Sequence, residues 1–136
     1  MNKVKKIVPY LALFILCAIP ILVLVGWTIN NTTLTRILPQ FTPMNPVTAT
    51  CFALVGFALL IERFSKGKIR RSVFLISGSI AFLVGGLMIL KYLGGVDLLI
   101  DRIFFESKLG INRMAPTTSI NFFLIGICLI VYPRFK

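Results

Sequence analysis

Four long stretches of this chain contain no charged residue, and they restrict its fold more than any other feature. They cover residues 7–35, 37–61, 72–90 and 114–133. A helix needs about 20 mainly apolar residues to cross the hydrocarbon core of a bilayer, and each stretch is long enough. Backbone groups in lipid must bond to one another, so a spanning segment is a helix or part of a closed barrel. The strict alternation of polar and apolar residues that is typical of barrel strands is absent, and we therefore predict helices.

The composition agrees with a membrane protein and argues against catalysis. Of the 136 residues, 57% are hydrophobic and 14% are charged, whereas a soluble domain has about 25% charged residues. The sequence contains no histidine, which removes the usual ligand of haem and of most transition metals. No polar residues suggest a nucleophile with its base. We expect no metal, no cofactor and no enzymatic activity.

The 15 basic residues are divided unevenly between the two ends of the predicted helices. Ten of them belong to the N-terminal segment, the connection 63–71 and the C-terminus. Lys and Arg are retained on the cytoplasmic side during insertion. We therefore predict a multi-pass protein of the bacterial inner membrane, with both termini and the connection 63–71 in the cytoplasm. Phe64 is the one aromatic residue among the charges of that connection, which favours contact with anionic lipids and argues against nucleic acid.

The sequence contains an internal repeat with an offset of 70 residues. Residues 44–56 read MNPVTATCFALVG, and residues 114–126 read MAPTTSINFFLIG. The identical pairs are Met44/Met114, Pro46/Pro116, Thr48/Thr118, Phe52/Phe122, Leu54/Leu124 and Gly56/Gly126. Shared hydrophobicity alone does not produce a matched Met-x-Pro-x-Thr at two helix starts. We interpret residues 1–136 as one membrane domain, with a first repeat at about 7–62, a cytoplasmic loop at 63–71 and a second repeat at about 72–133.

Each repeat is predicted to be an outgoing helix, an external connection and a returning helix that begins at Pro46 or Pro116. Both repeats start on the same side, so the predicted fold class is an all-α membrane protein with four transmembrane helices in two parallel two-helix repeats. The second connection has Val96, Leu99, Ile100, Ile103 and Phe104 on one helical face and Asp97, Asp101 and Lys108 on another. This spacing predicts a short amphipathic helix in the membrane interface. Trp27, Lys91 and Tyr92 lie at outer helix ends, where we expect interface anchors.

The repeated motif places a stripe of residues at four-residue intervals on each returning helix. The third apolar stretch carries a similar stripe of small residues. Small residues let membrane helices approach one another closely. We therefore predict packing between helices at Phe52, Gly56, Phe122, Gly126, Ser77, Ala81 and Gly85.

A second interpretation of the motif is a binding site. Helix N-termini carry unbonded amides and a partial positive charge, and two of them would face one external cleft. Asn121 would add an amide one turn into an apolar helix, where it needs a partner. The predicted ligand-binding residues are Met44, Thr48, Met114, Thr118 and Asn121. Packing of the bundle is the alternative explanation for the same stripe.

Two groups of residues, one in each half, give the chain a resemblance to a known family. The first group is Trp27, Met44, Pro46, Thr48 and Ala49. The second is Tyr92, Gly94, Gly95, Asp97, Asp101, Arg102, Arg113, Met114, Pro116, Thr118, Ser119, Phe122 and Gly126. With these residues the chain resembles, over nearly its whole length, the N-terminal membrane sensor regions of bacterial sensor histidine kinases and diguanylate cyclases. In that family the last helix leads into PAS domains and a kinase or cyclase, whereas this chain stops at Lys136.

The resemblance implies a membrane-embedded sensory or ligand-binding module of a bacterial signalling protein, which we expect to lack an output domain of its own. Its expected partners are the lipid bilayer, a small lipophilic ligand, and either a second copy in a homodimer or another membrane or signalling protein. The alternative is a small structural or accessory subunit of a larger membrane complex, in which the motif serves only to pack helices.

Overall fold

The computed structural model describes residues 3–36, 39–95 and 98–134. Within these ranges all regular structure is helical and no strand is present, as predicted. The long helices are α1 (Lys3–Thr28), α2 (Pro46–Phe64), α3 (Lys68–Gly94) and α5 (Pro116–Val131). The short ones are η1 (Ile100–Arg102), α4 (Glu106–Leu109) and η2 (Tyr132–Arg134).

Three of the long helices are candidates to cross a membrane. The segments Ile7–Thr28, Pro46–Phe64 and Lys68–Gly94 are long and apolar enough, while α5 is apolar but shorter. Large apolar side chains are exposed along them; Ile7 and Phe14 of α1, for example, are 61% and 68% exposed. Water would make such a continuous apolar surface unfavourable, whereas hydrocarbon chains would cover it. The helix lengths and this surface support the prediction of a membrane protein.

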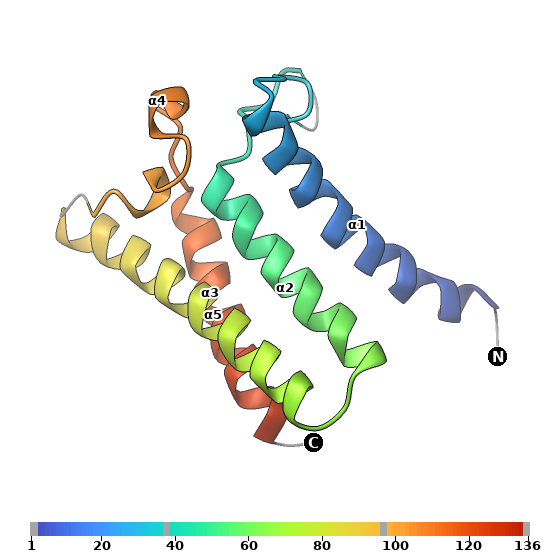
Figure 1. Ribbon diagram of the computed structural model, residues 1–136. Helices are drawn as coiled ribbons and strands as arrows, with labels where there is room; N and C mark the ends of the chain where they lie inside the picture. Colours follow the sequence, from blue (N-terminus) through green and yellow to red (C-terminus); the bar gives the residue numbers. More distant parts are fainter. Residues whose placement is uncertain (1–2, 37–38, 96–97, 135–136) are drawn as a thin grey trace.

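The long helices form two pairs that run side by side (Figure 1). α1 packs mainly against α2, α3 packs along α5, and contacts between α2 and α3 join the pairs. Both termini and the turn between α2 and α3 lie at one end of the bundle, which we call the terminal end. The connections that follow α1 and α3 lie at the opposite end, the loop end.

Glycines at corresponding positions of the motif allow the helices of each pair to approach closely. A Cβ atom at Gly126 would lie 2.5 Å from the backbone nitrogen of Phe82 in α3, closer than real Cβ atoms come. A Cβ atom at Gly56 would lie 2.9 Å from the Sγ atom of Cys17 in α1. Gly85 of α3 faces α5, where a Cβ atom would lie 2.5 Å from the nitrogen of Phe123. Each motif glycine therefore faces the helix that precedes it.

The remaining residues of the predicted packing stripes lie in the interior. Ser77 and Ala81 of α3 and Phe122 of α5 are at most 2% exposed. Phe52 is half-buried and meets the Phe122 ring edge-on, with 4.8 Å between the ring centroids. The stripes of α2 and α5 therefore make two kinds of contact. Their glycines face α1 and α3, and their phenylalanines face each other across the two halves of the bundle.

The prediction of an amphipathic helix in the second connection is wrong. Val96 and Asp97 lie outside the described residues, and the rest of the connection forms the two short helices η1 and α4. Leu99 and Phe105, which precede them, have positive φ angles of 51° and 58°, a conformation that cannot continue a right-handed helix. Asp101, expected on a polar outer face, is instead fully buried. Its contacts, described below, hold the connection against the bundle.

Candidate functional site

The returning helices α2 and α5 both begin with proline at the loop end, as predicted. The Asn45 side chain caps α2, because its Oδ1 atom accepts a hydrogen bond from the Val47 amide at 2.9 Å. Ala115 holds the same position before α5 and has a similar extended backbone, with φ −67° and ψ 147° against −61° and 136° at Asn45. It provides no side-chain cap. The two helix starts therefore share their backbone geometry and differ in capping.

A groove of about 290 Å³ lies between these two helix starts. Both copies of the motif line it, through Met44 and Thr48 from the first and Met114 and Thr118 from the second. Four of the five predicted ligand-binding residues are therefore brought together, and we call this site the motif groove. The fifth, Asn121, is exposed on α5 and does not line the groove. It lies one residue before the buried Phe122 and thus about 100° away around the helix axis.

The threonine hydroxyls of the motif groove differ from the hydroxyls beside them. Thr50 donates a hydrogen bond to the Pro46 carbonyl at 2.9 Å, and Ser119 donates one to the Ala115 carbonyl at 3.1 Å. Within the described part of the chain, the hydroxyls of Thr48 and Thr118 form no hydrogen bond. The groove thus combines apolar walls with two hydroxyls that are available to a ligand, the composition typical of small-molecule sites.

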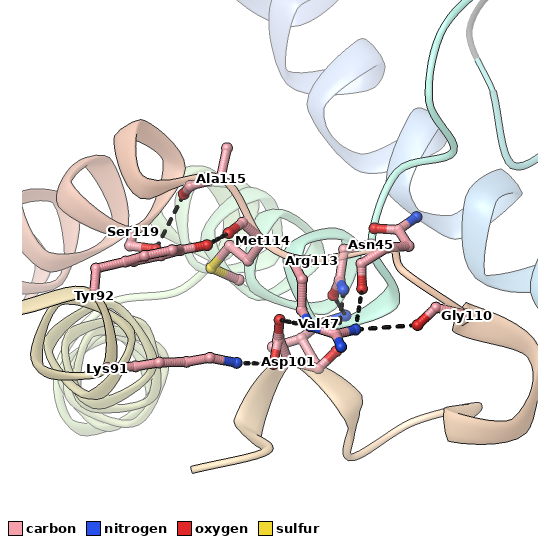
Figure 2. A network of polar contacts seen from close by, with 11 residues as sticks. Asn45, Val47, Lys91, Tyr92, Asp101, Gly110, Arg113, Met114, Ala115 and Ser119 are labelled. Carbon is pink, nitrogen blue, oxygen red and sulfur yellow. Dashed lines mark hydrogen bonds and ion pairs between the residues drawn. The ribbon is translucent and has the colours of Figure 1, made fainter. Parts of the chain in front are cut away.

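A buried ion pair at the loop end holds the second connection against the helices. The Asp101 side chain is fully buried, and its Oδ1 atom lies 3.0 Å from the Lys91 ammonium nitrogen. Its Oδ2 atom lies 3.9 Å from Nε of Arg113, and Figure 2 shows all three side chains converging. The Asn45 side-chain amide donates a hydrogen bond to the Asp101 carbonyl at 3.0 Å. A carboxylate removed from water needs such partners, so this network ties α3 and the second connection to the start of α2.

Aromatic side chains hold the backbone of both motif methionines. The Trp27 indole nitrogen of α1 donates a hydrogen bond to the Met44 carbonyl at 2.8 Å. The Tyr92 hydroxyl of α3 donates one to the Met114 carbonyl (Figure 2). In each half, the outgoing helix therefore positions the start of the returning helix. From the sequence, Trp27 and Tyr92 were expected only as anchors in the membrane interface, and this role was missed.

The buried position of Asp101 was also missed from the sequence, because its partners are distant along the chain. Lys91 precedes it by ten residues, and the Asn45 amide comes from the other half, 56 residues away. The one signal in the sequence was that Asp101, Tyr92 and Trp27 belong to the residues on which the predicted resemblance to the sensor regions rests.

Comparisons of the chain with protein-family models, with curated proteins and with solved structures give no match. The resemblance to membrane sensor regions therefore stays a prediction. In this chain the site consists of a groove between two helix starts, two available hydroxyls, and a buried ion pair that contacts Arg113 of the groove lining.

Proposed function

We propose that this chain is a membrane-embedded sensory or ligand-binding module of a bacterial signalling protein, and that a small lipophilic ligand binds in the motif groove. One observation carries the proposal. The Met and Thr of both motif copies line a single groove, and neither threonine hydroxyl forms a hydrogen bond among the described residues. A pure packing seam would be filled by its own side chains, whereas this groove keeps about 290 Å³ open.

The proposed topology has four transmembrane helices in two parallel repeats. The 16 residues of α5 span about 24 Å, and the three residues of η2 that follow add about 6 Å. Together they match a hydrocarbon core of about 30 Å. α5 also runs along α3, which is long enough to span. The basic residues of segment 63–71 lie at the terminal end, which we place in the cytoplasm of the bacterial inner membrane.

Signal transmission would use the two returning helices, whose first residues line the motif groove and which run from the loop end to the terminal end. There the Tyr132 hydroxyl donates a hydrogen bond to the Glu62 carboxylate, which joins the end of α2 to η2. The Tyr132 ring also stacks on Phe74 of α3, with 5.3 Å between centroids. A ligand that changes the spacing of the helix starts would act on this junction. A homodimer partner or a separate signalling protein would detect the change.

The test removes the two hydroxyls while keeping the side-chain shape. The double variant Thr48→Val, Thr118→Val is compared with Thr50→Val, whose hydroxyl is bonded to Pro46 outside the groove. Native mass spectrometry of the detergent-purified protein would detect a retained small molecule. We expect the wild type and Thr50→Val to retain it, and the double variant to lose it at unchanged melting temperature.

A structural or accessory subunit is the second candidate, and the exposed face of α1 favours it. α1 packs mainly against α2, and Ile7, Phe14 and Ile21 are each more than half exposed. A neighbouring protein helix would cover this face as well as lipid does. Retention of no small molecule by the wild type, together with unfolding of the double threonine variant, would support this candidate and contradict the sensory one.

A further inference from the structure

A second and larger cleft adjoins the motif groove at the loop end. Its volume is about 630 Å³, and it shares four lining residues with the groove: Thr42, Pro43, Asn112 and Arg113. Three cationic side chains line it, those of Arg36, Lys108 and Arg113, and no acidic side chain of the described residues does. We call it the basic cleft.

The cations of the basic cleft are held in place by backbone carbonyls. The Lys108 ammonium donates a hydrogen bond to the Trp27 carbonyl at 3.3 Å, and an Nη1 donor of Arg36 bonds the Pro39 carbonyl at 3.1 Å. Arg113 donates through Nη1 to the Gly110 carbonyl at 3.2 Å. These contacts orient the positive groups but do not neutralise them.

The positive charge of the cleft is poorly compensated. Arg113 has Asp101 at 3.9 Å, but neither Arg36 nor Lys108 has an acidic partner among the residues that the structure describes. The Nε atom of Arg36 is buried and forms no hydrogen bond there. A buried donor without a partner is unfavourable. An anion in the cleft would not reach this closed-off Nε atom, but beside the uncompensated charges of Arg36 and Lys108 it would neutralise the cleft.

The chemistry of the cleft favours a phosphate group. A guanidinium group bonds two phosphate oxygens at once, and an ammonium group supplies a point charge to a third. Beside these cations, Phe41 and Ile111 line the same cleft and are 54% and 96% exposed. A polar head with an apolar attachment would match both parts of the surface.

We propose that the basic cleft binds the phosphate group of a lipid headgroup or of a soluble phosphate ester, with Arg36 and Lys108 as its principal ligands. The site goes beyond the proposed function, because neither residue lines the motif groove. Either site can be absent while the other is present. The basic cleft and the motif groove share Arg113, which also contacts the buried Asp101, so phosphate binding would act on a residue of the motif groove.

The test is a calorimetric titration of the full chain in an uncharged maltoside detergent. The probes are inorganic phosphate, glycerol 3-phosphate and dihexanoyl phosphatidylglycerol. The variants are Arg36→Gln and Lys108→Gln, and the matched control is Arg71→Gln, an exposed cation at the terminal end. Melting temperatures establish that each variant is folded, and Arg36→Lys serves in place of Arg36→Gln if the latter unfolds.

We expect the wild type to bind at least one probe, and each glutamine variant to bind it at least about tenfold more weakly, equivalent to about 1.4 kcal/mol. The control is expected to bind like the wild type, and Arg36→Lys to bind more weakly than the wild type, because an ammonium group lacks the paired donors of a guanidinium group. Binding of glycerol 3-phosphate would assign a soluble ester, and binding of phosphatidylglycerol alone would assign a lipid headgroup. The proposal would be overturned if the wild type bound none of the probes. It would also be overturned if folded Arg36→Gln and Lys108→Gln bound a probe as tightly as the wild type does.

Discussion

At the scale of single residues, two adjacent glycines of α3 face very different surroundings. A Cβ atom at Gly85 would lie 2.5 Å from the nitrogen of Phe123 and 2.6 Å from the carbonyl oxygen of Ser119. One at Gly86 would meet only the Phe123 ring, at 3.5 Å, which is ordinary van der Waals contact. The backbones of α3 and α5 therefore touch at Gly85 and leave room at Gly86.

This difference predicts opposite tolerance to the same substitution. Gly85→Ala is expected to lower the free energy of unfolding by about 1–3 kcal/mol, because the added methyl group overpacks backbone against backbone. Gly86→Ala gains the same helix propensity without this overpacking and is expected to equal the wild type or to exceed it by up to about 1 kcal/mol. Unfolding in mixed micelles with increasing SDS measures both values. Equal stability of the two variants would contradict the close contact.

Asp101 is the second residue on which the loop end depends. Its carboxylate is fully buried, and its partner Lys91 is only 13% exposed. Asp101→Asn would remove the charge that both Lys91 and Arg113 face in a poorly solvated position. We expect a loss of about 3–5 kcal/mol in the free energy of unfolding, the usual result of removing one member of a buried pair.

The control for Asp101→Asn is Glu106→Gln, which neutralises an exposed acid of the same connection. It is expected to change stability by no more than about 0.5 kcal/mol. Equal effects of the two substitutions, measured by the same unfolding titration, would show that the buried pair adds nothing to the fold.

At the scale of elements, the beginnings of the returning helices followed from local chemistry. Proline suits a first helical turn and asparagine suits a cap, so the starts at Pro46 and Pro116 were predictable from adjacent residues. The turns at Leu99 and Phe105 were not, because apolar residues rarely adopt a positive φ and helical spacing does not reveal it. The ion pair between Asp101 and Lys91, ten residues earlier, determines the conformation of the second connection instead of the helical spacing.

The motif groove was partly predictable for the same reason. The repeat itself identified Met44, Thr48, Met114 and Thr118, since equivalent positions of the two copies lie beside one another at the loop end. Asn121 has no counterpart in the first copy, where the equivalent residue is Cys51. Only its polarity suggested that it belongs to a ligand-binding site. Its direction depends on how α5 is rotated against α3, which only the tertiary contacts determine.

The unequal capping of the two helix starts predicts an effect at the level of the element. Ala115 has the backbone geometry of a cap residue but no capping side chain. Ala115→Asn is expected to raise the free energy of unfolding by about 0.5–1 kcal/mol, because its side chain would bond an amide of the first turn. Asn45→Ala is expected to lower it by about 1 kcal/mol or more, since Asn45 also bonds the Asp101 carbonyl. A destabilising Ala115→Asn, measured by SDS unfolding, would contradict the equivalence of the two helix starts.

At the scale of the whole molecule, the proposed arrangement of four spans places the two proline-led helix starts on the same side of the membrane. The described helices fit this arrangement, because both long connections lie at the loop end and both termini at the terminal end. The basic residues of segment 63–71 belong to the terminal end. The motif groove and the basic cleft would then both open on the outer surface.

Cysteine labelling in intact bacterial cells determines on which side of the membrane each connection lies. Cys17, Cys51 and Cys128 are replaced by alanine, and single cysteines are introduced by Lys66→Cys, by Ser107→Cys and after Lys136. With a maleimide that does not cross membranes, we predict that the cysteine at position 107 reacts in intact cells. The other two are predicted to react only after permeabilisation. Reaction at position 66 in intact cells, or of the C-terminal cysteine from the same side as position 107, would contradict the four-span arrangement.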